Sequence, residues 1–258
     1  MSLAAAAQAQ APVAAQPPVH VFAAGSLREV FTEVAAAYEA RSGGKVALTF
    51  GASGLLRERI DKGERPDVFA SADTVHPQRL ANGAQWKAPV VFTHNGLCAL
   101  TSAAINATPD TVLDTLLRPN VRVGTSTPKS DPAGDYAWAL FERAEALRPG
   151  ARDALGAKAL KLTGGADSAQ APAGQGTYAW LMSQDRADVF ITYCTNAVSA
   201  RRELPALKVV AMPAALQVGA AYALTVREAA PEAASAFARY VLTDEAQAVF
   251  RRLGFGAP

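Results

Sequence analysis

Cysteine and histidine are scarce in this sequence, and their positions exclude one common class of structural site. The 258 residues include two cysteines and three histidines. Cys98 and Cys194 have no other cysteine or histidine at the spacing of metal ligands, so a structural zinc site is excluded. The two can form a disulfide in an oxidising compartment, but each also lies in an apolar run where a buried free thiol is ordinary, and the sequence does not decide. His20, His76 and His94 are isolated and are interpreted as surface or turn residues.

A strong excess of one charge and a long apolar run are also missing. The chain has 25 Lys and Arg against 23 Asp and Glu, a net charge of +2. Because the basic residues are scattered among acidic ones, no stripe can neutralise a nucleic-acid backbone, and we expect no nucleic-acid partner. After the first residues, no segment reaches the apolar length that a membrane span needs. Half of the residues are hydrophobic and 19% are charged, which is typical of a globular protein with room for two domains.

The first residues have a composition unlike the rest of the chain. Residues 1–17 are mostly Ala, Gln and Pro, without an amphipathic period, and we expect a disordered leader. The Ala/Gln run resembles the region around a cleaved signal peptide, which predicts a secreted, periplasmic protein whose signal is largely removed. The alternative is a cytosolic protein with a low-complexity tail.

Strand-like and helical patterns then alternate along the chain. Residues 20–24 are a short β-branched and aromatic run that predicts a buried strand. A helical pattern follows, carried by apolar residues at spacings of three and four: Leu27, Val30, Phe31, Val34 and Tyr38. A second strand at 46–50 and a second helix from Leu55 repeat the arrangement, which predicts an α/β fold with a parallel sheet flanked by helices. Further predicted elements are strands at 68–70, 121–124, 189–193 and 208–212, an extended segment at 89–100, and helices at 135–147, 196–202 and 231–253.

Small and hydroxyl-bearing residues occupy three of the expected strand-to-helix turns. They are Gly25 and Ser26, then Ala52, Ser53 and Gly54, then residues 131–134. Ligands bind on this side of an open α/β sheet, and helix N-termini with free N–H groups favour anions. A single serine at such a position is most often a helix N-cap, but two successive turns of the same kind favour an anion site over capping alone.

The sequence resembles the periplasmic molybdate-binding proteins of bacterial ABC importers. The resemblance is carried by FAAGSL at 22–27, FGASG at 50–54, PDVFASAD at 66–73, PAG at 132–134 and the strand ending at Tyr193, and it covers nearly all of 20–258. It implies a type II periplasmic-binding-protein fold: two α/β domains, each a mostly parallel sheet flanked by helices, with the ligand in the interdomain cleft. Domain 1 is expected at 18–97 and 215–258, and domain 2 at 98–214.

The resemblance also implies a set of ligand-binding residues. Ser26 and Ser53 match two serines that bind the oxyanion through hydroxyl and N–H groups. Ala133 matches a backbone N–H donor and Tyr193 a hydroxyl donor from the second domain. A further backbone donor is expected near Gln175.

The third turn departs from the best-known bacterial pattern because an acid stands at Asp131. The archaeal relatives place a carboxylate in the coordination sphere of the oxyanion's metal, and Asp131 is an additional candidate ligand on that ground. A carboxylate repels a dianion unless it ligates the metal centre or turns away. The favoured alternative is that Asp131 caps the following helix.

The resemblance implies an extracytoplasmic solute-binding protein, a monomer, that captures molybdate or tungstate and delivers it to the permease of an ABC importer. We expect no catalytic residue, no cofactor and no protein-bound metal. One alternative is a binding protein for another oxyanion, or for a metal ion held by Asp131 and Tyr193. An alternative of another class is a small phosphate-binding α/β enzyme; no Ser/His/Asp arrangement, Walker loop or metal cluster can be assembled to support it.

Overall fold

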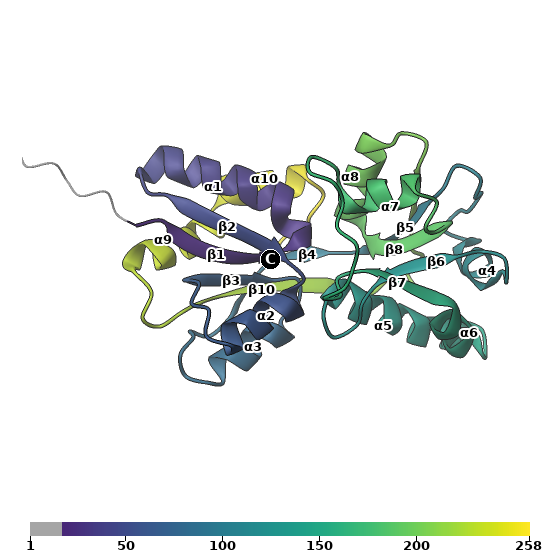
Figure 1. The fold of residues 1–258 in the computed structure, drawn as a ribbon, viewed down its shortest axis with the longest axis horizontal. Coiled ribbons are helices and arrows are strands. Elements are labelled where there is room, and N and C mark those ends of the chain that lie inside the picture. The colour runs from purple at the N-terminus through teal and green to yellow at the C-terminus, as the bar shows by residue number, and fades with distance from the viewer. Residues whose placement is uncertain (1–16) are drawn as a thin grey trace, which may run out of the picture.

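Two five-stranded sheets lie side by side along the long axis of the molecule in the computed structural model, which describes residues 17–258 (Figure 1). Apart from Pro17, the leader expected at 1–17 lies outside the described residues. The first sheet has the order β2-β1-β3-β10-β4 and the second has the order β7-β6-β8-β5-β9.

The strands of the first sheet are β1 Val19–Ala24, β2 Val46–Gly51, β3 Val68–Ser71, β4 Val90–Asn95 and β10 Ala220–Val226. Its helices are α1 Arg28–Ser42, α2 Ser53–Asp61, α3 Val75–Ala81, α9 Glu232–Val241 and α10 Asp244–Arg252, with a short 3-10 helix at Gly25–Leu27. The strands of the second sheet are β5 Leu97–Thr101, β6 Val123–Ser126, β7 Ala159–Thr163, β8 Val189–Tyr193 and β9 Lys208–Ala211. Its helices are α4 Val112–Leu117, α5 Pro132–Leu147, α6 Ala151–Lys158, α7 Thr177–Ser183 and α8 Cys194–Glu203.

In each sheet four strands run in one direction and one is reversed. Strand β10 pairs antiparallel with β3 and β4, and β5 pairs antiparallel with β8 and β9, whereas the other pairings are parallel. The reversed strand is the one that enters its domain directly from the other domain. The prediction of two mostly parallel sheets flanked by helices, with two crossings, is therefore confirmed.

The two crossings lie close together between the lobes, where β4 and β10 run toward the second sheet (Figure 1). The first crossing is a single residue, Gly96, between β4 and β5. The sequence predicts Leu97 as the end of domain 1, whereas in the structure Leu97 is the first residue of β5 in the second sheet. The second crossing spans 212–219.

Helix α1 holds the first domain together. Val30, Phe31, Val34 and Tyr38 of α1 are buried, and so is Leu27 in the 3-10 helix just before it, as the predicted helical spacing requires. The ring of Phe31 packs edge-on against Phe92, Phe237 and Phe250 at centroid distances of 5.8, 6.2 and 6.2 Å. Truncating such a side chain costs about 3–5 kcal/mol of stability. These contacts join the C-terminal helices to the turn that carries Ser26.

The amphipathic segment at 231–253 is two helices, not the single helix that its period predicts. Helix α9 ends at Val241 and α10 begins at Asp244. The Thr243 side chain accepts a hydrogen bond from the Ala246 N–H, and two acids follow in the first turn of α10. A capping threonine followed by acids is a helix start, and this local signal overrides the apolar periodicity.

Candidate functional site: a polar cleft between the domains

A cleft of about 1040 Å³ lies between the two domains. Residues of both domains line it, among them Ser26 and Arg28 from the first and Tyr193 and Thr195 from the second. The carboxyl ends of the parallel strands point to this place, which is where ligands bind in open α/β sheets.

Strand register places the two serine turns level with each other. Ala24 at the end of β1 pairs with Gly51 at the end of β2, and each serine follows two residues later. Ser26 lies in the short 3-10 helix and lines the cleft. Its Oγ is 2.9 Å from the hydroxyl oxygen of Tyr222 on β10. The first predicted ligand residue is therefore at the cleft surface.

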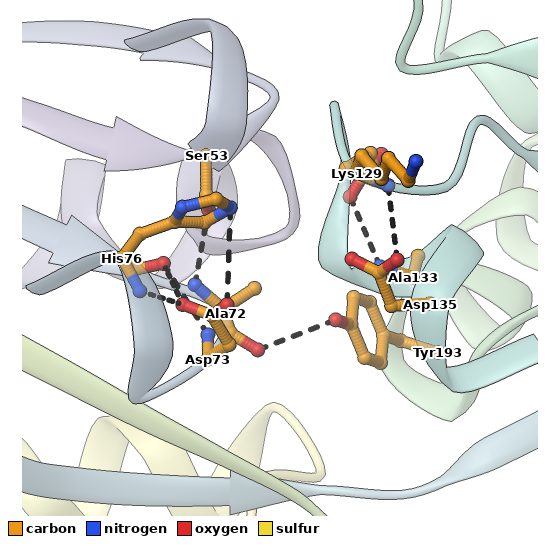
Figure 2. A network of polar contacts seen from close by, with 10 residues as sticks. Ser53, Ala72, Asp73, His76, Lys129, Ala133, Asp135 and Tyr193 are labelled. Atoms are coloured by element: carbon orange, nitrogen blue, oxygen red, sulfur yellow. Dashed lines mark hydrogen bonds and ion pairs between the residues drawn. The ribbon is translucent and has the colours of Figure 1, made fainter. Parts of the chain in front are cut away.

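Ser53, the second predicted serine, has no exposed surface and is not among the residues that line the cleft. It is the first residue of α2, and its Oγ accepts a hydrogen bond of 3.1 Å from the Ala72 N–H (Figure 2). In this arrangement of the domains the Ser53 hydroxyl is hydrogen-bonded to the backbone of its own domain and does not face the cleft.

Gly54 brings the start of α2 against the second domain. Its N–H donates to the carbonyl oxygen of Ser130 at 2.9 Å. A Cβ at Gly54 would lie 2.5 Å from the Lys129 carbonyl oxygen and 2.6 Å from that of Ser130, so only glycine fits. Lys129 itself has a positive φ of 68°, stabilised in part by the bond from its N–H to Asp135 (Figure 2). The two domains are thus in direct backbone contact beside the cleft.

Tyr193, at the end of β8, faces the first domain. Its hydroxyl donates to the Ala72 carbonyl oxygen at 3.4 Å, across the domain boundary (Figure 2). Burial raises the pKa of Tyr193 well above its usual range, so the hydroxyl stays neutral. Ser53 and Tyr193 therefore meet on the same residue, Ala72, from opposite domains.

The two cysteines form a disulfide next to Tyr193. Cys98 on β5 is bonded to Cys194, the first residue of α8, across 96 residues of sequence. A link over such a separation stabilises a domain by about 2–4 kcal/mol. This resolves the choice that the sequence left open, and it holds the start of α8 against the sheet beside the cleft.

Asp131 caps helix α5, as the favoured interpretation predicts. Its Oδ1 accepts from the Ala133 N–H at 3.1 Å, and its Oδ2 accepts from the Ser126 hydroxyl at 2.6 Å. Burial is the largest influence on the pKa of Asp131 and raises it, although both hydrogen bonds act in the opposite direction. The backbone donor expected at Ala133 is consequently occupied by a side chain of its own turn.

Gln175 is exposed and lies in the long loop between β7 and α7, much of which lines the cleft. Its N–H donates to the carbonyl oxygen of Pro172 at 3.1 Å. The end of this loop is fastened to α8, because the Gly176 N–H donates to the Glu203 carboxylate at 2.8 Å. The structure thus places Ser26, Asp131, Gln175 and Tyr193 on one cleft and leaves Ser53 and Ala133 beneath its surface.

Several cleft residues were not identified from the sequence. Arg28 and Arg59 line the cleft, with their guanidinium groups 4.6 Å from the ring centres of Phe50 and Phe22. Thr195 lines it from α8, and Tyr222 supports Ser26 from β10. Helical spacing in α1 and α2 could have indicated the arginines, but nothing local marks Tyr222.

His76 is buried rather than at the surface, which corrects the sequence interpretation. It is 6% exposed, and neither ring nitrogen has a hydrogen-bond partner among the described residues. Burial lowers its pKa, and the nearby Asp73, 3.8 Å away, acts in the opposite direction. His76 packs at the start of α3 beside Ser53 and Asp73 (Figure 2).

Within residues 17–258, no three side chains of His, Cys, Asp or Glu are grouped so that they could hold a metal ion. In that same part of the chain, no helix combines the length and apolarity that crossing a bilayer takes.

Two α/β domains, two chain crossings and a cleft between the domains are the features of the type II periplasmic-binding-protein fold. The chain belongs to the bacterial extracellular solute-binding protein family, whose model matches residues 19–256. An uncharacterized protein of Pasteurella multocida is 40% identical over 185 residues, which cover 71% of this chain and 77% of that relative.

Two solved structures have a similar fold. The periplasmic molybdate-binding protein of Azotobacter vinelandii superposes with a TM-score of 0.74 at 20% identity, covering 93% of this chain and 99% of that one. PEB3 of Campylobacter jejuni, solved with L-phospholactate bound, superposes with a TM-score of 0.72 at 17% identity, covering 93% and 100%.

Proposed function

We propose that this protein captures a tetrahedral oxyanion, molybdate or tungstate, in the interdomain cleft and delivers it to the permease of an ABC importer, working as a monomer in the periplasm. The observation that carries the proposal is that hydroxyl-bearing residues of opposite domains, Ser26 of the first and Tyr193 and Thr195 of the second, line one cleft. The family and the molybdate-binding neighbour support the same assignment.

Neutral donors suit this class of ligand. A fully ionised oxyanion offers lone pairs on every oxygen, and hydroxyl and amide groups from two domains can surround it without a bound cation. A donor supplied by each domain also gives the anion a means to hold the cleft closed, because only the closed state offers both.

The predicted ligand residues have different roles under this proposal. Ser26 and Tyr193 contact the anion, and for Tyr193 the hydroxyl hydrogen must turn from the Ala72 carbonyl oxygen to the anion. An additional bond from the Ala133 N–H requires the Asp131 carboxylate to release it, which also relieves the repulsion between that carboxylate and a dianion. Ser53 acts indirectly, by holding Ala72 where the Tyr193 hydroxyl meets it.

A second candidate ligand is a larger anion, an organic molecule that carries a phosphate or similar group. The cleft keeps about 1040 Å³ although the domains touch through Gly54 and Ser130. Pockets of about 300–1,000 Å³ enclose whole organic molecules, far more than a bare tetrahedral anion. Arg28 and Arg59 on the lining offer charge for a second anionic group. The phospholactate complex of PEB3 provides the precedent.

A thermal-shift screen followed by calorimetry separates the two candidates. The panel is molybdate, tungstate, sulfate, phosphate and L-phospholactate. A ligand present at a hundred times its Kd stabilises the protein by about 2.7 kcal/mol. The proposal predicts that molybdate and tungstate raise Tm strongly and sulfate weakly. A response to L-phospholactate alone supports the second candidate, and no response to any of the five overturns the oxyanion assignment.

A further inference from the structure

Asn95 lies at the first crossing, between the hydroxyl of Thr195 in the second domain and that of Tyr222 in the first. It is the last residue of β4, it is 7% exposed, and it precedes Gly96, the single residue that joins the sheets. Its side chain is bonded to Thr195 of the second domain and to Tyr222 of the first.

The orientation of the Asn95 amide is fixed by its neighbour. The Gly96 N–H donates to Asn95 Oδ1 at 2.9 Å, which assigns the oxygen to that side. The nitrogen, Nδ2, is therefore the atom 2.9 Å from Thr195 Oγ1 and 3.4 Å from the Tyr222 hydroxyl. An amide nitrogen only donates, so both hydroxyl oxygens act as acceptors here.

The direction of these two hydrogen bonds determines which hydroxyl hydrogens remain free to face the cleft. Either oxygen of the 2.9 Å contact between Ser26 Oγ and the Tyr222 hydroxyl can be the donor. Among the described residues, the Tyr222 hydroxyl is hydrogen-bonded only to Asn95, which donates to it, and to Ser26, so we assign the Tyr222 hydrogen to Ser26 Oγ. Ser26 Oγ then accepts from Tyr222, and the hydrogen of the Ser26 hydroxyl remains free to donate to a ligand in the cleft. Thr195, likewise an acceptor from Asn95, has its hydrogen left for the same cleft. Burial raises the pKa of Tyr222 well above its usual range, so the phenol keeps the proton that it donates.

We propose that Asn95 is a positioning residue that directs the hydroxyl hydrogens of Ser26 and Thr195 toward the ligand, so that these two groups act as donors only. The inference rests on the proposed oxyanion function and deepens it. Molybdate carries no proton at neutral pH and accepts from both hydroxyls. Hydrogen phosphate carries a proton that needs an acceptor, and this cluster offers it none.

Two variants test the relay in different ways. Asn95→Asp keeps an oxygen for the Gly96 N–H but replaces the donor nitrogen with an acceptor, so Thr195 and Tyr222 must turn their hydrogens inward. Tyr222→Phe keeps the ring that packs against Tyr193 at 5.4 Å, removes the link to Ser26 and adds no charge.

The measurement is the calorimetric affinity for molybdate and for hydrogen phosphate, each a dianion at pH 8. We expect Asn95→Asp to lower molybdate affinity about 100-fold and Tyr222→Phe about tenfold, from the range for hydrogen bonds to charged groups. Hydrogen phosphate affinity should fall less in both, so the ratio of the two affinities drops. Added charge alone weakens both dianions equally and leaves the ratio unchanged.

Tyr38→Phe and Asn82→Asp are the matched controls. Tyr38 donates its hydroxyl to the Ala233 carbonyl oxygen away from the cleft, and Asn82 is exposed at the end of α3. Neither control should change the ratio. If the wild type binds molybdate and neither Asn95→Asp nor Tyr222→Phe lowers the ratio, the relay is overturned while the proposed function stands. If the wild type binds neither anion, the proposed function is overturned and the relay with it. Should Asn95→Asp fail to fold, Tyr222→Phe decides alone.

Discussion

The two βα turns of the first domain have similar sequences and level positions, yet they have different surroundings. The Ser26 turn opens on the cleft, and its hydroxyl contacts Tyr222 from the far end of the chain. The Ser53 turn contacts the second domain through the Gly54 N–H and the Ser130 carbonyl oxygen, and the buried Ser53 hydroxyl accepts from the Ala72 N–H. A strand-to-helix turn with small residues and a serine can therefore supply either a ligand donor or a domain contact. What lies opposite the turn decides which.

The largest effect is expected from Gly54→Ala, which should disrupt the Ser53 turn. The added Cβ would lie 2.5–2.6 Å from two carbonyl oxygens of the 129–130 backbone, which cannot swing aside as a side chain can. Overpacking of this kind destabilises the packed state by up to about 3 kcal/mol. If the domains separate to relieve the overlap, the same free energy lowers ligand affinity about 100-fold.

Calorimetry and small-angle scattering of the ligand-bound protein measure this effect. Scattering should show the variant more extended than the wild type. Gly156→Ala on α6, where a Cβ meets nothing within 4 Å, is the control and should leave both readouts unchanged. Wild-type affinity in Gly54→Ala would show that the Ser53 turn is not a closure contact.

The next effect comes from replacing each serine in turn. Ser26→Ala should lower ligand affinity by about 2 kcal/mol, because a donor to a charged ligand is lost, with little change in unfolding free energy. Ser53→Ala should lower the free energy of unfolding by about 1–3 kcal/mol, because the buried Ala72 N–H loses its acceptor.

Calorimetry and chemical denaturation of both serine variants give the two quantities side by side. If Ser53→Ala loses affinity at unchanged stability, the two turns are equivalent and both hold the ligand.

The smallest effect is expected at the exposed edge of the cleft. Arg202 on α8 makes two hydrogen bonds, of 2.9 and 3.0 Å, to the Glu29 carboxylate on α1, across the domains. Both side chains are about half exposed, so Arg202→Ala should weaken ligand binding by less than about 1 kcal/mol. The difference should vanish at high salt, where exposed pairs are screened. Arg201→Ala removes the same charge one residue earlier and serves as control. An effect that persists at high salt would contradict this assignment.

Local patterns in the sequence predicted many of the elements, but not β7, β10, α4, α6 or α7, and not the pairings between distant residues. The strand 189–193 and the buried face of α1 follow from apolar spacing, and both are confirmed. The break at Thr243 differs from the predicted single helix because the local helix-cap signal overrides the apolar periodicity.

Contacts between residues far apart in the sequence became visible only in the folded structure. Tyr222 lies on a strand that the sequence reading did not identify, and its contact with Ser26 spans 196 residues. The contact of the Ser53 turn with the second domain depends on how that domain sits, and no local pattern encodes that placement.

A crystal structure grown with molybdate, with anomalous scattering recorded at the molybdenum edge, tests the proposed function at the site itself. We expect one anomalous peak in the interdomain cleft, with the oxygens of the anion within hydrogen-bond distance of the hydroxyls of Ser26, Thr195 and Tyr193 and no cation beside it. A peak elsewhere, or a cleft whose hydroxyls point away from the bound anion, would contradict the proposed function.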